Sequence, residues 1–395
     1  MHGPPLCLAR ISGSSGYIRT SANVLLLMRI GLDVHVLTGP HQGTTSVWMN
    51  LLSELPPTHE YVLYSFDPDE VSRRFPQEHF IHRRIPRIPA AARIQIAFPF
   101  MTRRDRCDVF HANYYGPIVG GPPLVLQVHD VIYLDFPEYS TGARSAMFAT
   151  LSRASAHAAK RVVTDSEWSK ERIVAQYTVP ADRVDVVPLG LDRSWRCPSE
   201  RAIERAWVEL QPRVPDRFAL SVGRLDPRKN FARTARVVRT LVDRGDLDGL
   251  VIVGPEDFGA SQIRAEMERD GTAKIVTHLS ALDTASLQAL YRHASCLLYL
   301  SLAEGFGLPL IEAMAMGAPI IASNRTSIPE VAGDAGLIVD PEDTEEAVSA
   351  LAQLLSSPQL RESLISRGNA RAKQFDGAVA ASQMIDVYAA AASAR

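Results

Sequence analysis

Two glutamates, Glu304 and Glu312, flank a glycine-rich turn in the second half of the chain. The apolar residues before Glu304 predict a buried strand, and Pro309 suits the first turn of a helix. Glu304 is then expected on the loop at the strand's carboxyl end, and Glu312 about one helical turn further on, roughly 5 Å along the axis. The outward-facing amides at the positive end of the helix dipole would be those of Phe306, Gly307 and Leu308. This geometry would hold an anion between two acidic hydrogen-bond acceptors, as a sugar–diphosphate–ribose ligand requires.

A second segment whose residues could take part in chemistry is SVGRLDPRKN, residues 221–230. It follows a predicted strand and leads into a predicted helix. Its cations include Arg224 and Lys229. Cations at a strand end can bind phosphate groups and stabilise negative charge that develops on them. Each segment also has a purely structural interpretation. Residues 221–230 can form a solvated basic loop capped by Asn230, and the two glutamates can belong to an ordinary strand–helix junction.

The elements that must position these residues alternate between strand and helix patterns. Strands are predicted over residues 30–37, 60–66, 107–113, 124–129, 161–165, 184–188, 218–223, 250–254, 274–279, 296–300, 319–322 and 337–339. Helices are predicted over residues 44–55, 142–160, 167–177, 231–243, 284–293 and 345–355. Alternation with near-continuous apolar strands implies parallel sheets covered on both faces. The chain therefore predicts an α/β protein with two Rossmann-like parallel-sheet domains, in which ligands bind outside the carboxyl ends of the strands.

The glutamate pair around the Gly305–Gly307 turn, together with the segment through Ser323, resembles the donor-site motif of retaining GT-B glycosyltransferases. The similarity is to glycosyltransferase family 4 (glycosyl transferases group 1), and it is mannosyltransferase-like. Residues 223–230 resemble the family's G-R-x-x-x-x-K-N signature, and residues 127–139 resemble its "HD…FPE" segment. The resemblance covers residues 28 to about 375 and is most specific from 222 to 341.

This resemblance implies a role for each matched residue. Glu304 would hold hydroxyls of the transferred sugar, and Glu312 would hold those of the ribose. Arg224 and Lys229 would bind the diphosphate. His129, at a strand end of the first half, would contact the sugar from across a cleft. The expected catalytic residues are His129, Glu304, Arg224 and Lys229, and the expected donor-binding residues are Gly43, Gly223, Arg224, Lys229, Glu304, Gly305, Phe306, Gly307, Leu308 and Glu312.

Three further segments match the family less closely. In the loop over residues 39–46, Gly43 matches, but Thr45 stands where a second glycine is usual, and this departure leaves the acceptor side open. Ser166 is expected to cap the following helix, with Ser169 at its third position. Residues 327–336 match a further family segment and are interpreted as structural, because Pro and Gly punctuate a short helix there.

Length and composition bound these expectations. The chain has 395 residues, a net charge of −2 and four scattered cysteines without a CxxC pair. These values predict a globular protein of two or three domains in a reducing compartment, with no nucleic-acid footprint. No apolar run approaches the ~20 residues of a membrane span. Residues 1–27 are expected to be a disordered or mis-started extension, and residues 28–195 an N-terminal acceptor-side domain. Residues 196–375 are expected to form a nucleotide-sugar-binding domain, and residues 376–395 a helix that crosses back to the N-terminal domain.

The implied activity is retaining transfer of a hexose from a nucleotide-diphosphate sugar to a hydroxyl of a glycan or polyprenyl-linked acceptor. Mannose from GDP-mannose is favoured over a UDP-hexose, and neither a cofactor nor a bound metal is expected, as in GT-B enzymes generally. The chain has no GxGxxG after a first strand, no P-loop, no GxSxG and no HExxH, so dehydrogenase, ATPase and hydrolase functions lack support. A GT-B nucleotide-sugar epimerase and a non-catalytic nucleotide-sugar-binding subunit remain alternatives.

The segment from Arg73 to Arg106 holds nine arginines against only Glu78 and Asp105. Isoleucines and phenylalanines are interleaved among them. Such a mixture suits contact with anionic lipid head groups, although a solvated face fits equally well. The hypothesis is a cytoplasmic enzyme, peripheral at the inner membrane face, in surface-polysaccharide or O-antigen assembly.

Overall fold

The computed structural model describes residues 17–19, 24–39, 43–139, 143–257, 259–280 and 282–394. Most of the predicted extension over residues 1–27 and part of the loop over residues 39–46 lie outside the described residues. The chain divides into two compact units. The first unit comprises Met1–Gln127, Thr150–Val163 and Ala381–Arg395, and the second comprises Val128–Ala149 and Thr164–Ala380.

One sheet has seven strands in the order β5-β4-β3-β6-β7-β8-β9. Their bounds are β3 Arg29–Asp33, β4 Glu60–Ser65, β5 Phe80–Arg84, β6 Val109–Asn113, β7 Leu124–Gln127, β8 Arg161–Thr164 and β9 Val184–Val186. The pairs from β5 to β8 are parallel. Buried apolar side chains such as Ile30 and Val62 fill these strands, as expected for a parallel sheet. A separate hairpin pairs β1 Tyr17–Arg19 with β2 Val24–Leu26 in antiparallel fashion.

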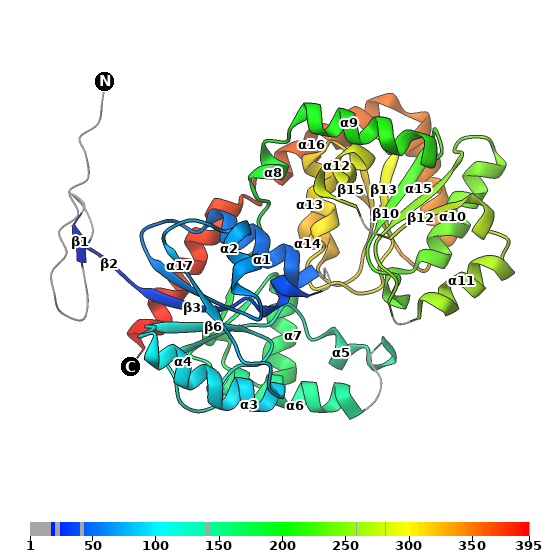
Figure 1. The fold of residues 1–395 in the computed structure, drawn as a ribbon. Coiled ribbons are helices and arrows are strands. Elements are labelled where there is room, and N and C mark those ends of the chain that lie inside the picture. Colours follow the sequence, from blue (N-terminus) through cyan, green and yellow to red (C-terminus); the bar gives the residue numbers. More distant parts are fainter. Residues whose placement is uncertain are drawn as a thin grey trace, which may run out of the picture. The chain divides into compact units, whose positions relative to one another are not determined.

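The helices of the chain's first half connect these strands (Figure 1). They are η1 His35–Thr38, α1 Gly43–Glu54, α2 Pro68–Arg74, α3 Ala90–Ala92, η2 Arg93–Ala97, α4 Phe98–Arg104, α5 Ile132–Asp135, η3 Pro137–Tyr139, α6 Ala143–Ala158, α7 Glu167–Tyr177 and η4 Ala181–Arg183. The C-terminal helix α17, Gly377–Ser393, also reaches the first unit, where the Tyr388 hydroxyl lies 2.7 Å from Nδ1 of His111. The expected C-terminal helix is therefore present.

The other sheet has six parallel strands in the order β12-β11-β10-β13-β14-β15. Their bounds are β10 Phe218–Val222, β11 Gly249–Val253, β12 Val276–Leu279, β13 Cys296–Tyr299, β14 Ile320–Ser323 and β15 Gly336–Val339. The helices are α8 Arg193–Arg196, α9 Glu200–Leu210, η5 Gln211–Arg213, η6 Pro227–Lys229, α10 Phe231–Asp243, α11 Ala260–Arg269, η7 Ala273–Ile275, α12 Thr284–His293, α13 Leu308–Ala315, α14 Ile328–Ala332, α15 Thr344–Ser356 and α16 Pro358–Ala372.

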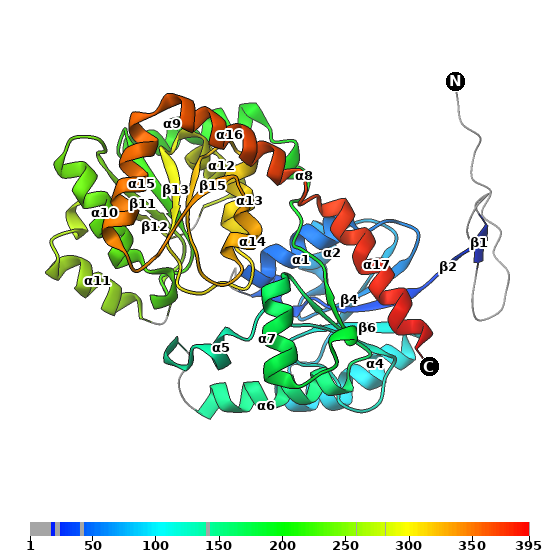
Figure 2. The same ribbon diagram turned by 180° about the vertical axis from the view of Figure 1, so that it is seen from behind.

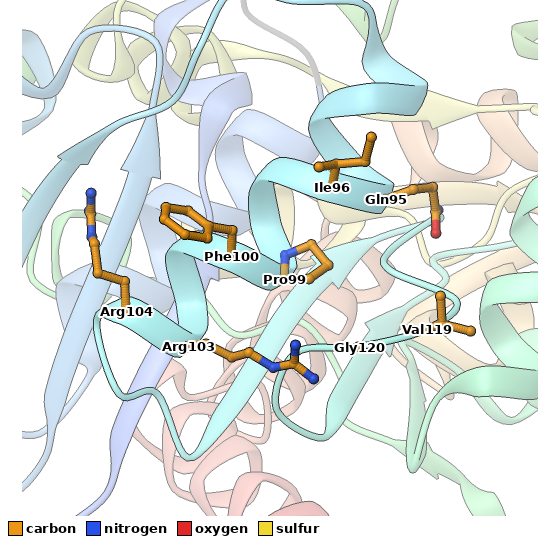
Figure 3. A pocket seen from close by; sticks show the side chains of 8 residues that line it. All are labelled: Gln95, Ile96, Pro99, Phe100, Arg103, Arg104, Val119 and Gly120. Atoms are coloured by element: carbon orange, nitrogen blue, oxygen red, sulfur yellow. The ribbon is translucent and has the colours of Figure 1, made fainter.

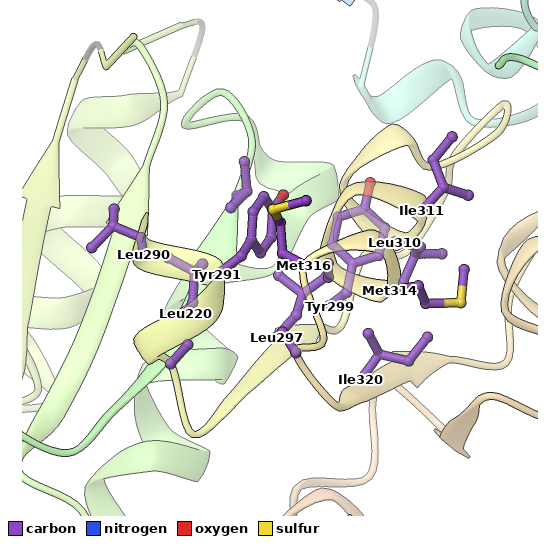
Figure 4. Close-up of a cluster of buried hydrophobic side chains, with 14 of the residues drawn as sticks. Leu220, Leu290, Tyr291, Leu297, Tyr299, Leu310, Ile311, Met314, Met316 and Ile320 are labelled. Carbon is purple, nitrogen blue, oxygen red and sulfur yellow. The ribbon is translucent and has the colours of Figure 1, made fainter. Parts of the chain in front are cut away.

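Two hydrophobic clusters cover the two faces of this six-stranded sheet. One packs α9, α12 and α13 against the strands, and the other packs α10, α11 and α15 against the opposite face, as Figures 1 and 2 show. Figure 4 shows part of the first cluster, in which Leu310 and Met314 of α13 meet Leu297 and Tyr299 of β13. Burial on both faces explains why these strands are nearly continuous apolar runs. The strand that carries the Glu304 loop is thus held rigidly.

The sequence patterns predicted most elements but not all of their ends. The predicted strand over residues 30–37 stops at Asp33, because Asp33 Oδ1 lies 2.8 Å from Nδ1 of His35 and the chain turns into η1. Strand β5 was not predicted, because its sequence FIHRR lacks an apolar run. The strand predicted to begin at residue 274 begins at Val276, after η7.

No helix of the described part of the chain is both long and apolar enough to cross a bilayer.

A substitution at Gly190 tests the close backbone contact between residues 190–191 and the start of α17. Leu191 pairs with Asp376 there, and a Cβ on Gly190 would lie 2.5 Å from Cα of Gly377. Backbone cannot move aside as a side-chain tip can, so Gly190→Ala should destabilise the fold by about 1–3 kcal/mol in urea unfolding. Gly39→Ala is the matched control, because the nearest atom to its Cβ is 3.9 Å away and its φ is −125°. Equal stabilities of the two variants would contradict this account.

Candidate functional site

The loops that carry the two donor motifs leave neighbouring parallel strands. β10 pairs with β13, with Ala219 opposite Cys296, and the chain order reverses between these two strands. In open α/β sheets ligands bind at such a switch point, outside the carboxyl ends of the strands. The loop after β10 and the loop after β13 therefore meet where the sequence predicts the nucleotide sugar.

A buried ion pair joins the two loops. Lys229 Nζ lies 2.5 Å from Glu304 Oε1, and the Tyr299 hydroxyl donates to the same oxygen at 2.8 Å. Arg228 donates to the carbonyl of Ala303 at 2.9 Å, and its guanidinium lies 3.9 Å from Glu304 Oε2. Glu304, which is expected to bind the sugar, and Lys229, which is expected to bind the diphosphate, thus lie in one cluster.

Burial and charge act in opposite directions on this cluster. Burial raises the pKa of Glu304, but Lys229 and Arg228 outweigh it, so the pKa of Glu304 is lowered and the group is a carboxylate at neutral pH. Burial lowers the pKa of Lys229 more than Glu304 raises it. Burial also opposes the charge of Arg228, but Glu304 and Asp226 raise its pKa overall. Arg228 is therefore a permanent cation beside the pair.

Gly223 leaves the space that Lys229 occupies. Its φ is +152°, and a Cβ there would lie 2.9 Å from Lys229 Cε and 3.3 Å from Nζ. A side chain at this position would push the lysine away from Glu304. The predicted signature thus requires glycine at position 223 because any side chain there would collide with Lys229.

Arg224 lies on the same loop, but the structure does not bring its guanidinium to Glu304. Arg224 forms an ion pair with Asp257 at 2.7 Å and is partly exposed. Among the described residues, the cation that lies next to Glu304 besides Lys229 is Arg228, which is not among the predicted site residues. Its position directly before the matched lysine was the available signal. Tyr299 was also missed, since it reads as one more apolar strand residue.

The glycine-rich turn after Glu304 is fixed by hydrogen bonds to its carbonyl groups, whereas three of its amides have no acceptor among the described residues. Ser327 Oγ donates to the carbonyls of Glu304 at 2.8 Å and Phe306 at 3.1 Å. Gly307, with φ +109°, precedes the first residue of α13. Within the described residues, no acceptor binds the amides of Phe306, Gly307 or Leu308. These three amides, at a helix N-terminus, are the donors that the sequence predicts to bind an anion.

Glu312 lies within the first turns of α13, in a different environment from Glu304. Its Oε2 accepts a hydrogen bond from the Tyr291 hydroxyl at 2.9 Å. Burial raises the pKa of Glu312 to about 7, Tyr291 lowers it in part, and Asp192 adds to the rise. Glu312 therefore changes charge near neutral pH, whereas Glu304 does not.

The structure also brings His129 to the Glu304 loop, within the second unit. A Cβ on Gly305 would lie 2.9 Å from the carbonyl oxygen of His129 and 2.8 Å from Cβ of Asp130, so only glycine permits this approach. The Gly305 carbonyl accepts from the hydroxyls of Ser166 at 2.7 Å and Ser169 at 3.0 Å. Ser166 also accepts from the Ser169 amide at 3.1 Å, which confirms its predicted capping role.

His129 is oriented by a carboxylate. Its Nδ1 lies 2.8 Å from Asp165 Oδ2, and both side chains are buried. Burial lowers the pKa of His129, but Asp165 and Asp130 raise it above its usual value overall. In the sequence Asp165 stands only at the end of the predicted strand 161–165, and its contact with His129 depends on the pairing of β7 with β8.

Gly43 is the one predicted donor-binding residue of the first unit. It begins α1, and a Cβ there would meet nothing within 4 Å. Thr45, which replaces an expected glycine, is buried, with its hydroxyl 3.5 Å from the carbonyl of Val36. Among the described residues, no three His, Cys, Asp or Glu side chains gather as a metal site would require.

Comparisons with known proteins agree with this geometry. Residues 205–371 match the family described as "Glycosyl transferases group 1", and residues 41–195 match "Glycosyltransferase Family 4". O-antigen chain mannosyltransferase B of Escherichia coli is 30% identical over 67% of this chain and 69% of its own length. MMP alpha-(1->4)-mannosyltransferase of Mycolicibacterium hassiacum is 30% identical over 68% of this chain and 65% of its own length.

Among solved structures, HepE of Anabaena in complex with UDP-glucose superimposes with a TM-score of 0.72 at 17% identity. The superposition covers 92% of this chain and 99% of that one. Two parallel-sheet Rossmann-like domains with a C-terminal helix therefore form a GT-B fold. With both halves matched by family and one relative aligned over two thirds of its length, the chain belongs to glycosyltransferase family 4, the glycosyl transferases group 1.

Proposed function

We propose that this protein is a retaining hexosyltransferase that moves mannose from GDP-mannose to a hydroxyl of a glycan or polyprenyl-linked glycan in surface-polysaccharide or O-antigen assembly. The observation that carries the proposal is the buried Lys229–Glu304 pair beside the open amides of residues 306–308. Mannose is favoured because two relatives bear mannosyltransferase names. A UDP-hexose is the alternative donor, since HepE is named in complex with UDP-glucose.

In the proposed reaction the bond from the sugar's anomeric carbon to the diphosphate breaks while a bond to the acceptor oxygen forms on the same face. The leaving phosphate oxygen takes the acceptor's proton. Arg228, Lys229 and the open amides stabilise the charge that develops on the diphosphate, so no metal ion is required. Arg224 would contribute once it exchanges Asp257 for phosphate.

Glu304 suits a binding role rather than a nucleophilic one. Its Oε1 already accepts from Lys229 and Tyr299, which leaves Oε2 to accept from sugar hydroxyls. His129, fixed through Nδ1 by Asp165, would contact the same sugar from the adjacent loop. Rigid polar groups that are positioned before the substrate arrives lose little free energy to reorganisation.

The basic segment supports the membrane part of the proposal only over a limited surface. Ile85, Ile94 and Phe98 are buried in the first unit. Arg83 and Arg84 are held in ion pairs with Asp105 and Asp69. Of the exposed side chains that remain, Arg87 and Ile88 lie on the loop after β5, and others lie on η2, α4 and the loop before β7, where they line one groove.

Figure 3 shows this surface, a groove of about 590 Å³ lined by Gln95, Ile96, Pro99, Phe100, Arg103, Arg104, Val119 and Gly120. Ile96, Phe100 and Val119 are 70%, 68% and 73% exposed. Exposed apolar side chains flanked by arginines fit the interface of an anionic bilayer. We therefore propose that a cytoplasmic form of the enzyme docks peripherally on the inner membrane face through this groove.

Glu304→Gln should reduce transfer from GDP-mannose about 100-fold or more, because the substitution removes the charge that holds Lys229 and the sugar. Product formation and the circular-dichroism spectrum should be measured together, with exposed Glu204→Gln as the matched control. An unchanged rate would sink the assignment. A wild-type protein that epimerises the donor without an acceptor, or binds it without turnover, would favour the two alternatives.

Glu312 predicts a pH dependence of donor affinity. Ribose hydroxyls donate to the ionised carboxylate, and its pKa is about 7. GDP affinity should therefore fall about 10-fold from pH 8 to pH 6 as the carboxylate takes up a proton. Calorimetric titration of Glu312→Gln supplies the control, because GDP's own titration persists in this variant. The variant should bind more weakly at pH 8 and lose most of the slope, and an unchanged slope would exclude Glu312.

Vesicle flotation tests the docking surface. The wild-type protein should float with phosphatidylglycerol vesicles at low salt, and the double change Ile96→Glu/Phe100→Glu should weaken binding about 10-fold or more by removing apolar contact. Val208→Glu is the matched control, since Val208 is 70% exposed on α9 of the second unit. Binding that is absent in the wild type, or equal in both variants, would contradict the surface.

A further inference from the structure

Among the described residues, one buried arginine of the first unit has no ion-pair partner. Arg93 is 9% exposed, and its Nε has no hydrogen-bond partner. Arg93 takes part in no ion pair there, although Arg83 of the same unit pairs with Asp105. Buried charges are normally paired, because removing a charge from water is costly. The guanidinium is therefore placed as if its anion arrives from outside the chain.

The surroundings of Arg93 form a defined cluster on one aromatic ring. Its guanidinium carbon lies 5.0 Å from the centre of the Phe66 ring, and that of Arg87 lies at the same distance. His35 meets the ring edge-on at 5.8 Å. The ring fixes two guanidinium groups while using none of their N–H donors, so both forks stay available for an oxyanion.

Asp33 does not neutralise this cluster. Its carboxylate is buried and pairs with His35, with Oδ1 2.8 Å from Nδ1. Asp33 raises the pKa of His35, against burial and the nearby charge of Arg93. The carboxylate of Asp33 is thus paired with the imidazole of His35. The positive charges of Arg93 and Arg87 are not balanced by it.

The cluster also lies where a ligand would be expected. Asp33 is the last residue of β3, Phe66 directly follows β4, and Arg87 follows β5 by three residues. These strands are neighbours in the order β5-β4-β3, so their carboxyl ends share one edge of the first sheet. Ligands of open parallel sheets bind outside this edge. The two donor motifs, residues 221–230 and 304–312, occupy the second unit, and of the predicted donor-binding residues only Gly43 follows β3 in the first unit.

We propose that Arg93 and Arg87, braced by Phe66, form a binding site for an oxyanion, a phosphate or a carboxylate, carried by the acceptor substrate. The identification of the ligand as the acceptor rests on the proposed function. The site itself rests on the unpaired buried arginine. It would orient an acidic acceptor and exclude neutral ones, because a neutral group would leave the guanidinium buried without an anion.

Anion-dependent stability tests the site. Binding to the folded state raises the melting temperature by mass action. Inorganic phosphate and sodium acetate should be titrated separately into the wild type, Arg93→Met and exposed Arg73→Met at constant ionic strength. The wild type and Arg73→Met should respond alike, and Arg93→Met should bind on the order of 10-fold or more weakly. A larger response to phosphate than to acetate would assign a phosphate-bearing acceptor, and the reverse a carboxylate.

The same experiment separates this site from the donor site. GDP should raise the melting temperature of all three proteins equally, so a missing GDP response counts against the proposed function and not against Arg93. Arg93→Met should melt no lower than the wild type without anions, because it removes an uncompensated buried charge. Arg87→Met keeps that charge and should show a reduced anion response. Equal anion responses in wild type, Arg93→Met and Arg87→Met would overturn the site.

Discussion

The buried ion pair between Lys229 and Glu304 is the constraint on which the donor half of this protein depends. Two charges removed from water lose several kcal/mol of hydration each, and only close geometry with further hydrogen bonds restores it. Two further hydrogen bonds supply that geometry. The Tyr299 hydroxyl donates to the Glu304 carboxylate, and Arg228 donates to the carbonyl of Ala303 in the same loop. Gly223 stays without a side chain so that the lysine can reach. The motif is thus one electrostatic unit rather than a set of separate ligands.

The fold makes this unit possible by placing β10 beside β13. Each strand is buried on both faces, so its carboxyl end and the loop that follows are fixed within the sheet. The same logic brings His129 in, because Gly305 lets the loop after β13 touch the segment after β7. Hydroxyls of Ser166 and Ser169 then hold the Gly305 carbonyl. Small residues at the contacts decide which polar groups can meet.

These relations explain what the sequence could and could not predict. Apolar periodicity predicted most strands, and the resemblance to the family's motifs selected Glu304, Lys229 and His129, which the structure gathers in one unit. Loop side-chain directions have no such periodicity: Arg224 turns to Asp257 and Arg228 to Glu304, and only tertiary contacts distinguish them. Strand β5 was missed because arginines hide its pattern. Roles in catalysis stay predictions, since geometry shows proximity and not turnover.

A comparison of two buried cations shows how the charge is divided between protein and substrate. Lys229 is matched by Glu304 inside the fold, so under the proposed function most of the uncompensated positive charge for the diphosphate would come from Arg228, the open amides and an Arg224 released from Asp257. Arg93 has no such internal partner among the described residues. A donor site that is neutral at its centre can release a dianionic product, because no uncompensated charge is left behind. An acceptor site with an unmatched cation instead selects strongly, since an empty or neutrally filled site leaves that charge buried alone.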